Sequence, residues 1–232
     1  MNKIKNTLQR NNVSASYLIE YLLEKFPEDQ IIIFGSEIEG RNSKYSDLDV
    51  YVITNDSEKK LNQNLKLNTL ILDIEILKAE QVLLLIKKVK EYKNMRLDNL
   101  KLLYRLREGI YLSEQFFGRA TFSKLEIDEA IKFYWNQKFI SLSDDILKAH
   151  MQGKFEENTL QIFKLIEIAE CIYLCNNHKV IVKEKWIHDD FINYAPLSIL
   201  KEEKDLLRKF ITENSDIITN MVLKFCNKLR YI

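Results

Sequence analysis

The sequence has few of the residues that make irregular backbone or covalent cross-links. Only five glycines, two prolines and three cysteines occur among its 232 residues. So little glycine and proline leaves scant material for long loops and favours a helix-rich chain. An odd number of cysteines, in a chain whose first residues lack the apolar segment of a signal peptide, is expected to remain as reduced thiols. We therefore expect a cytoplasmic protein.

The sequence also lacks a long apolar run and an excess of either charge. No run approaches the roughly 18 apolar residues of a membrane-spanning helix, so contact with a membrane is not predicted. Lysine and arginine number 35 against 34 for aspartate and glutamate, which gives a net charge of +1. A chain with so little net charge is not expected to coat long duplex nucleic acid. Its length suffices for one domain with a large core or for two small ones.

The most informative stretch, residues 31–53, holds a polar turn between two strand-like runs. The first run is β-branched and aromatic and stops at Gly35-Ser36, which is typical of a buried strand that ends in a tight turn. The free N–H groups of such a turn, together with the Ser36 hydroxyl, suit the oxygens of a polyphosphate. The second run alternates, so Asp47 and Asp49 are expected on the same face of a strand.

These two carboxylates repel each other, and a bound divalent cation is the natural reason to keep both ionised. The alternative is a solvated strand edge. A third acidic position follows in the apolar run of residues 70–77, where Asp73 and Glu75 again share one face. We choose Asp73 as the third ligand, because a shorter side chain holds a carboxylate more rigidly, and we keep Glu75 in reserve. If the two strands pair in antiparallel fashion, this choice needs a favourable register.

The combined motif resembles that of the DNA polymerase beta nucleotidyltransferase superfamily: Gly35-Ser36, ten intervening residues, Asp47-x-Asp49, and Asp73 between apolar neighbours. The bacterial branch with kanamycin nucleotidyltransferase and the minimal nucleotidyltransferases is the most similar in style. The resemblance covers about residues 30–77. It implies an α+β fold, in which a mixed sheet with flanking helices precedes an all-α helical bundle. It also implies a two-metal enzyme that transfers a nucleoside monophosphate from an NTP to an acceptor.

The resemblance gives roles to individual residues. Three carboxylates are expected to hold Mg²⁺ and to act in catalysis: Asp47, Asp49 and Asp73. Five residues are expected to bind ATP or another NTP: Gly35, Ser36, Arg41, Ser46 and Lys185. The lysine of this set resembles one in a Lys-Trp pair of some bacterial nucleotidyltransferases, and the alternative is an exposed base beside a tryptophan that anchors helix packing.

Helices are predicted around the sheet and throughout the rest of the chain. Periodic apolar residues indicate helices at residues 14–26 and 78–93, while the polar residues 54–67 are read as a loop or a short helix. Four further helical segments are expected to form a bundle: about 125–151, 157–176, 182–194 and 197–228. The last could be two helices that divide near Ser215. Within the second segment, Glu170 falls on a polar stripe.

From this organisation we predict a nucleotidyltransferase catalytic domain at residues 1–119. The bundle, residues 120–232, would form the acceptor side of the cleft, as the resemblance implies. The expected partners are an NTP and an acceptor that is a small molecule, a protein or an RNA end. A homodimer is also considered. Two other functions stay open: an antitoxin-type module that binds and modifies a protein partner, and a non-catalytic nucleotide-binding relative.

Two clusters of functional residue types have alternative interpretations. Eight basic residues against two acidic ones occur between Lys87 and Arg107. They either form a solvated helix surface or contact the triphosphate or an anionic acceptor. Cys171, Cys175 and His178 have helical spacing, but the lack of a fourth ligand favours core packing over a metal site.

Overall fold

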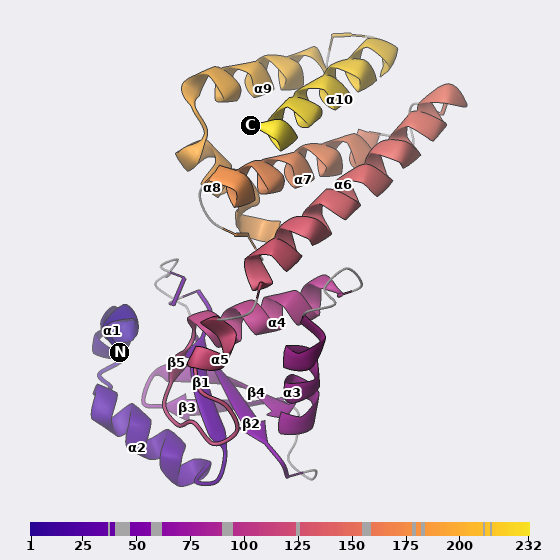
Figure 1. Ribbon diagram of the computed structural model, residues 1–232. Coiled ribbons are helices and arrows are strands. Elements are labelled where there is room, and N and C mark those ends of the chain that lie inside the picture. Colours follow the sequence, from indigo (N-terminus) through magenta and orange to yellow (C-terminus); the bar gives the residue numbers. More distant parts are fainter. Residues whose placement is uncertain are drawn as a thin grey trace. The chain divides into compact units, whose positions relative to one another are not determined.

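Figure 1 shows the computed structural model of the chain. It describes residues 1–36, 38–39, 47–56, 62–89, 95–123, 126–154, 159–177, 180–181, 184–210, 212–213 and 215–232. The chain forms two compact units. The N-terminal unit comprises Met1–Tyr92 and Asp98–Ile127, and the helical unit comprises Lys93–Leu97 and Asp128–Ile232.

A five-stranded mixed sheet is the centre of the N-terminal unit, and it confirms the predicted α+β class. Its strands are β1 (Gln30–Phe34), β2 (Leu48–Thr54), β3 (Asn62–Leu67), β4 (Leu70–Lys78) and β5 (Ile110–Tyr111). They lie in the order β3-β4-β2-β1-β5. Strands β2 and β4 are parallel, whereas the other neighbours are antiparallel. The parallel pair replaces the antiparallel arrangement considered for the two acidic strands.

Strand β3 shows that the loop or short helix predicted over residues 54–67 is wrong, although residues 57–61 lie outside the described part of the chain. Leu67 is buried, while Asn62 and Asn64 are exposed. Asn68 follows with a φ of 56°, in the left-handed region that asparagine tolerates, and the chain turns directly into β4. A mostly polar edge strand of this kind carries little apolar signal, so its sequence resembles a loop.

One face of the sheet is apolar and packs on two N-terminal helices. The short helix η1 (Asn2–Ile4) leads into α1 (Lys5–Arg10), and α2 (Ala15–Lys25) lies close to the predicted helix 14–26. Ser14 caps α2, since its Oγ accepts a hydrogen bond from Tyr17 N at 3.1 Å. Leu18 and Leu22 of α2 are buried in one cluster with Ile33, Val50, Ile74 and other residues of the sheet.

Further helices of this unit follow β4 in the chain. These are α3 (Ala79–Lys88), α4 (Leu97–Glu108) and the short α5 (Ala120–Ser123). Figure 1 shows α2 and α4 on opposite sides of the sheet. On α4, Leu100, Leu103 and Leu106 are fully buried, which gives this helix an apolar stripe against the unit.

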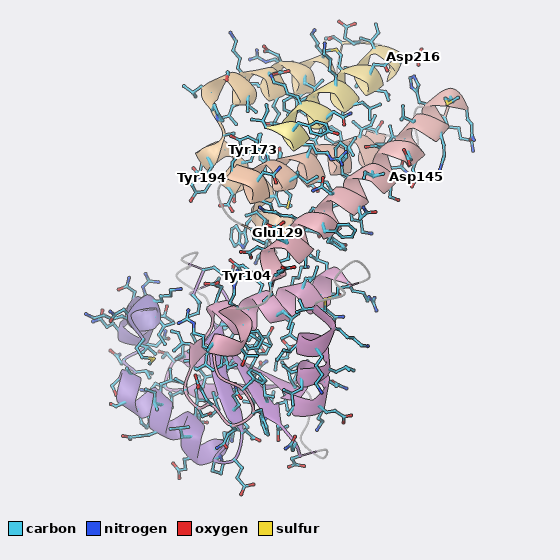
Figure 2. All side chains as sticks on the ribbon, in the orientation of Figure 1. Tyr104, Glu129, Asp145, Tyr173, Tyr194 and Asp216 are labelled. Atoms are coloured by element: carbon cyan, nitrogen blue, oxygen red, sulfur yellow. The ribbon has the colours of Figure 1, made fainter. Side chains whose placement is uncertain are left out.

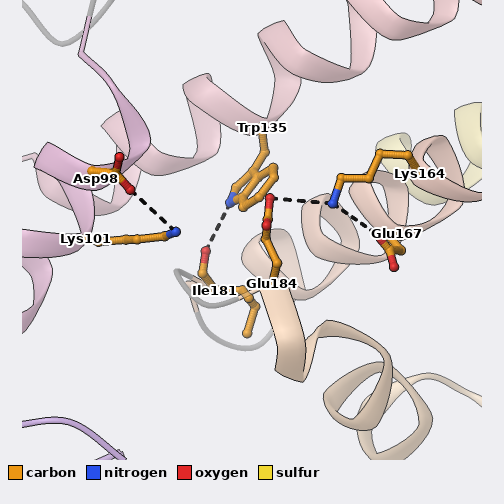
Figure 3. Close-up of polar contacts among 7 residues, drawn as sticks. All are labelled: Asp98, Lys101, Trp135, Lys164, Glu167, Ile181 and Glu184. Carbon is orange, nitrogen blue, oxygen red and sulfur yellow. Dashed lines mark hydrogen bonds and ion pairs between the residues drawn. The ribbon is translucent and has the colours of Figure 1, made fainter. Parts of the chain in front are cut away.

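The helical unit confirms the prediction of a helical second half. It contains α6 (Ile127–Met151), α7 (Thr159–Asn177), η4 (Glu184–Trp186), α8 (Ile187–Tyr194), α9 (Leu197–Lys209) and α10 (Ser215–Tyr231). Helix α7 is the most buried and packs on α8 and α10, while α9 packs on α10. The ring of Tyr173, labelled in Figure 2, meets Phe191 of α8 edge-on with centroids 5.6 Å apart. Trp135 Nε1 donates to the Ile181 carbonyl oxygen at 3.0 Å (Figure 3).

Three details of the helical unit differ from the sequence reading or extend it. The segment predicted over residues 197–228 is two helices, α9 and α10. Glu170 is buried rather than part of an exposed polar stripe. Cys171 and Cys175 are buried in α7, and His178 lies outside the described residues. Among the described helices, none combines the length and the apolar character that crossing a bilayer requires.

Candidate active site

Acidic and aromatic side chains occupy the sheet face opposite α2. In the strand register Phe34 pairs with Asp49, Asp49 with Asp73, and Asp73 with Asn64. Directly paired residues project to the same face from strands about 4.8 Å apart. The carboxylates of Asp49 and Asp73 therefore come from adjacent positions of two parallel strands.

The next row on this face places Glu75 away from the aspartate pair. Tyr51 lies opposite Ile32 on one side and Glu75 on the other. Asp73, and not Glu75, is consequently the direct cross-strand neighbour of Asp49. This distinction depends on the register, which the alternation within each strand does not reveal.

The turn after β1 presses its backbone against the Asp49 side chain. Gly35 has a φ of +96°, and a Cβ atom placed on it would lie only 1.7 Å from Asp49 Oδ2. Glu39 N donates to the Gly35 carbonyl oxygen at 3.1 Å, which ties Glu39 to the end of β1. Glycine is needed here for both its backbone conformation and its lack of a side chain.

Arg105 of α4 brings a positive charge to the same face. Its Nη1 donates to the Tyr51 hydroxyl at 3.1 Å, and its guanidinium carbon lies 5.2 Å from the centroid of the Phe34 ring. The Phe34 and Tyr51 rings are stacked, with centroids 3.6 Å apart. Burial opposes the charge on Arg105, but Tyr51 and the carboxylates of Glu39 and Asp49 raise its pKa. The guanidinium therefore stays charged beside Asp49 and Asp73, which together with Asp47 we call the acidic row.

Comparison with known proteins identifies a domain in the part of the chain that carries this arrangement. Residues 15–111 match the family model of the nucleotidyltransferase domain, and this range includes the strands that carry Asp49 and Asp73 together with the Gly35 turn. The N-terminal unit carries a nucleotidyltransferase domain. This confirms the resemblance that the sequence motif indicated.

One solved structure with a similar fold is that of a nucleotidyltransferase-like protein from Exiguobacterium sibiricum. The TM-score is 0.50 at 15% sequence identity, over 94% of this chain and 73% of that one. At this identity the similarity concerns the fold alone. No curated protein matches the chain in sequence.

Some residues predicted for the nucleotidyltransferase site have a described position. Asp47 directly precedes β2 and is exposed, whereas Ser36 is half-buried. Lys185 belongs to the helical unit, where its Nζ lies 4.9 Å from the centroid of the Trp186 ring. Two further predicted residues lie outside the described part of the chain: Arg41 and Ser46.

Sequence reasoning did not single out the aromatic part of this site. Within the eight basic residues between Lys87 and Arg107, the sequence marks Tyr104-Arg105 as candidates to contact a triphosphate or an anionic acceptor. Among the described members of that group, Lys101 pairs with Asp98 at 3.8 Å on the same helix (Figure 3). The α-helical spacing that puts Leu103 and Leu106 in the core leaves Arg105 on a neighbouring face, but only the fold shows that this face meets Tyr51.

The residues of the acidic row fit a hard divalent cation. Carboxylate oxygens are the ligands that Mg²⁺ prefers, and two carboxylates on adjacent strands offer them side by side. The Gly35 backbone limits the positions that the Asp49 carboxylate can take. Asp49 could hold one such ion together with the exposed Asp47, two residues before it, and a second ion together with Asp73. Burial raises the pKa of Glu75 and Asp73 adds to the rise, against the opposing charge of Arg105.

Proposed function

We propose that the protein is a Mg²⁺-dependent nucleotidyltransferase. It would move a nucleoside monophosphate, with AMP from ATP as the first choice, onto a hydroxyl of a small molecule, a protein or a nucleic-acid end. The observation that carries the proposal is the direct cross-strand pairing of Asp49 with Asp73 beside the Gly35 turn. The nucleotidyltransferase domain over residues 15–111 supports it.

Each residue of the acidic row has a distinct role in this proposal. Asp47 and Asp49 hold the ion that accompanies the triphosphate. Asp73 completes a second ion site and accepts the proton of the attacking hydroxyl. Bound Mg²⁺ supplies charge neutralisation on the phosphoryl oxygens. The Gly35-Ser36 turn donates hydrogen bonds to the β- and γ-phosphates.

The proposed reaction is an in-line displacement at the α-phosphorus. The acceptor oxygen forms a bond to this phosphorus while the bond to the β-phosphate oxygen breaks, so pyrophosphate leaves. The acceptor proton goes to Asp73. Because little covalent chemistry is left to the protein, positioning and electrostatics account for most of the rate. Arg105 would act as a positioning residue, because it holds Tyr51 and lies close enough to affect Asp49 electrostatically.

Other parts of the assignment extend this proposal. Arg41, Ser46 and Lys185 are proposed contacts to the nucleotide. Residues 1–119 would carry out the transfer, and residues 120–232 would form the acceptor side. The cytoplasmic location, the homodimer and the identity of the acceptor stay predictions.

A label-transfer experiment tests the proposed function. Each α-³²P-labelled NTP is incubated with the protein and Mg²⁺ in the presence of small-molecule, protein or RNA fractions. We expect transfer from one NTP to one fraction, and its loss in Asp49→Asn and without Mg²⁺. Asp56→Asn is the matched control, since Asp56 is exposed just beyond the end of the same strand. Absence of transfer from every NTP, or equal transfer by Asp49→Asn, would contradict the proposal.

A further inference from the structure

Three side chains with metal-ligand chemistry meet inside the helical unit. Glu170 comes from α7, His188 from α8 and Glu203 from α9. One ligand atom from each of the three lies within 4.8 Å of the others. His188 Nδ1 is 3.1 Å from Glu170 Oε1. Three separate helices thus bring one imidazole and two carboxylates to one point.

The two carboxylates are buried without enough hydrogen bonds. Glu170 is 2% exposed and Glu203 is 4% exposed. Glu170 Oε2 and Glu203 Oε1 have no hydrogen-bond partner. Burial raises the pKa of Glu170 strongly, and the neighbouring Glu203 and Glu167 raise it further. Two adjacent buried carboxylates need a proton or a cation between them, because an uncompensated buried charge is strongly destabilising.

We propose that Glu170, His188 and Glu203 bind one divalent transition-metal ion of the Zn²⁺ class. An imidazole nitrogen with two carboxylate oxygens is a donor set that suits zinc and related ions better than Mg²⁺. The cluster belongs to the helical unit, so it is separate from the acidic row of the sheet. The proposal does not depend on the proposed nucleotidyl transfer.

The ligand atoms already lie close enough together to bind an ion with little movement of their side chains. Zinc bonds to nitrogen and oxygen are about 2.0–2.2 Å long, which separates ligand atoms in a tetrahedral site by about 3.4 Å. The contact of 3.1 Å between His188 and Glu170 is already near this separation. The side chain of His188 is 57% exposed, so an ion from solvent can bind the imidazole first. The buried carboxylate oxygens next to it can then complete the site.

The ion would stabilise the packing of the helices in this unit. Helix α7 packs on α8 and α10, and α9 packs on α10. Ligands from α7, α8 and α9 would add a direct link among these three helices through a single ion. Metal binding of this kind adds directly to the free energy of unfolding, since the unfolded chain has no preformed site.

Zinc titration of the full chain tests the site. The titrations use the Asp49→Asn background, so that the carboxylates of the sheet compete less for the ion. We expect one Zn²⁺ per chain by calorimetry and a rise of Tm with added Zn²⁺. His188→Ala should weaken binding by about 100-fold or more, because even partners outside the ligand set contribute about 10- to 100-fold to metal affinity. The imidazole is exposed, so the change removes little packing and takes away one contact of Glu170.

Two further variants complete the test. Glu203→Gln should remove both the calorimetric signal and the Tm rise, whereas Glu202→Gln, an exposed neighbour on α9, should keep them. If the carboxylates instead share a proton, the full chain without substitutions in its helical unit binds no Zn²⁺. Its Tm is then unchanged by the ion. That result, or equal zinc affinity in His188→Ala and Glu202→Gln, overturns the proposal.

Discussion

Gly35 and Asp49 show how a single missing side chain sets the position of a carboxylate. The glycine adopts a φ of +96°, and its Cα faces Asp49 Oδ2 so closely that no Cβ fits between them. A larger residue would have to move either the turn or the carboxylate. The turn and the acidic row are therefore one structural unit, although residues 37–48 separate Ser36 from Asp49 in the sequence.

Gly35→Ala should therefore impair nucleotide binding more than it impairs folding. The strained backbone costs about 1–3 kcal/mol of unfolding free energy, and displacement of Asp49 should abolish Mg²⁺-dependent NTP binding. Gly153→Ala is a matched control, because Gly153 also has a positive φ of 70° but nothing lies within 4 Å of the position that its Cβ would take. Calorimetric NTP titration and thermal unfolding measure the two effects. Normal NTP binding by Gly35→Ala would refute this role.

The pairing of Asp49 with Asp73 leads to a second prediction at this scale. Asp73→Asn should lower transfer by about 100-fold or more and spare Mg²⁺–NTP binding. Glu75→Gln should keep most activity, because Glu75 pairs with Tyr51 and not with Asp49. Steady-state transfer rates and NTP affinities separate the two variants. The reverse pattern would move the third-ligand role to Glu75.

At the scale of the elements, side chains continue the hydrogen bonding of β1 along the edge where β5 ends. Strand β5 covers only Ile32 and Ile33. Beyond it, Ile31 N donates to Ser113 Oγ at 3.0 Å, and Ser113 Oγ donates to the Asp29 carbonyl oxygen at 2.9 Å. Gln30 is fully buried and bonds the backbone of Phe116 and Phe117 through both ends of its amide. These contacts continue the sheet where no strand is present among the described residues.

Gln30→Leu should therefore destabilise the N-terminal unit. The substitution leaves three backbone groups of Phe116 and Phe117 without partners, at a cost of about 3 kcal/mol in unfolding free energy. Gln81→Leu changes an exposed glutamine on α3 in the same way and should cost less than about 0.5 kcal/mol. Urea unfolding monitored by circular dichroism gives both values. Equal midpoints for the two variants would show that the Gln30 amide contributes nothing.

The elements also differ in how far the sequence predicts them. Strands β1, β2 and β4 are continuous or alternating apolar runs. Asp49 and Asp73 stand out because their charges interrupt such runs, and Asp47 stands out because it directly precedes one. Strand β3 cannot be recognised from the sequence because it is mostly polar, and β5 is too short to give a pattern of its own. Glu170 falls on the polar stripe of its helix, and helical spacing alone does not show that helices cover both sides of α7. Tertiary contacts decide these three cases.

At the scale of the whole molecule, the two units divide near Ile127 and Asp128. Helix α5 therefore belongs to the N-terminal unit, and its Phe122 is fully buried against Phe117 with ring centroids 5.2 Å apart. A fragment that ends before α5 would lack this ring. The apolar surface around Phe117 would then be open to water.

A fragment of residues 1–127 should consequently be more stable than one of residues 1–119. Loss of the buried ring costs about 3–5 kcal/mol, and the exposed surface should promote association. Phe122→Ala in the full chain is the control, since it removes the same ring without shortening the chain. Thermal unfolding and sedimentation compare the three proteins. A soluble, monomeric 1–119 fragment with the Tm of 1–127 would contradict this expectation.

The sheet also has a consequence for synthesis on the ribosome. Helices α1 and α2 and strands β1 to β4 lie in one continuous part of the chain that ends at Lys78. Because domains form from the amino-terminal side as the chain emerges, Asp49 and Asp73 can meet before α4 has emerged from the ribosome. The nascent chain would then present an assembled acidic row with Phe34 and Tyr51 still uncovered. Once α4 is in place, Arg105 would contact Tyr51 and the Phe34 ring. Until then, these rings would offer chaperones an exposed aromatic surface.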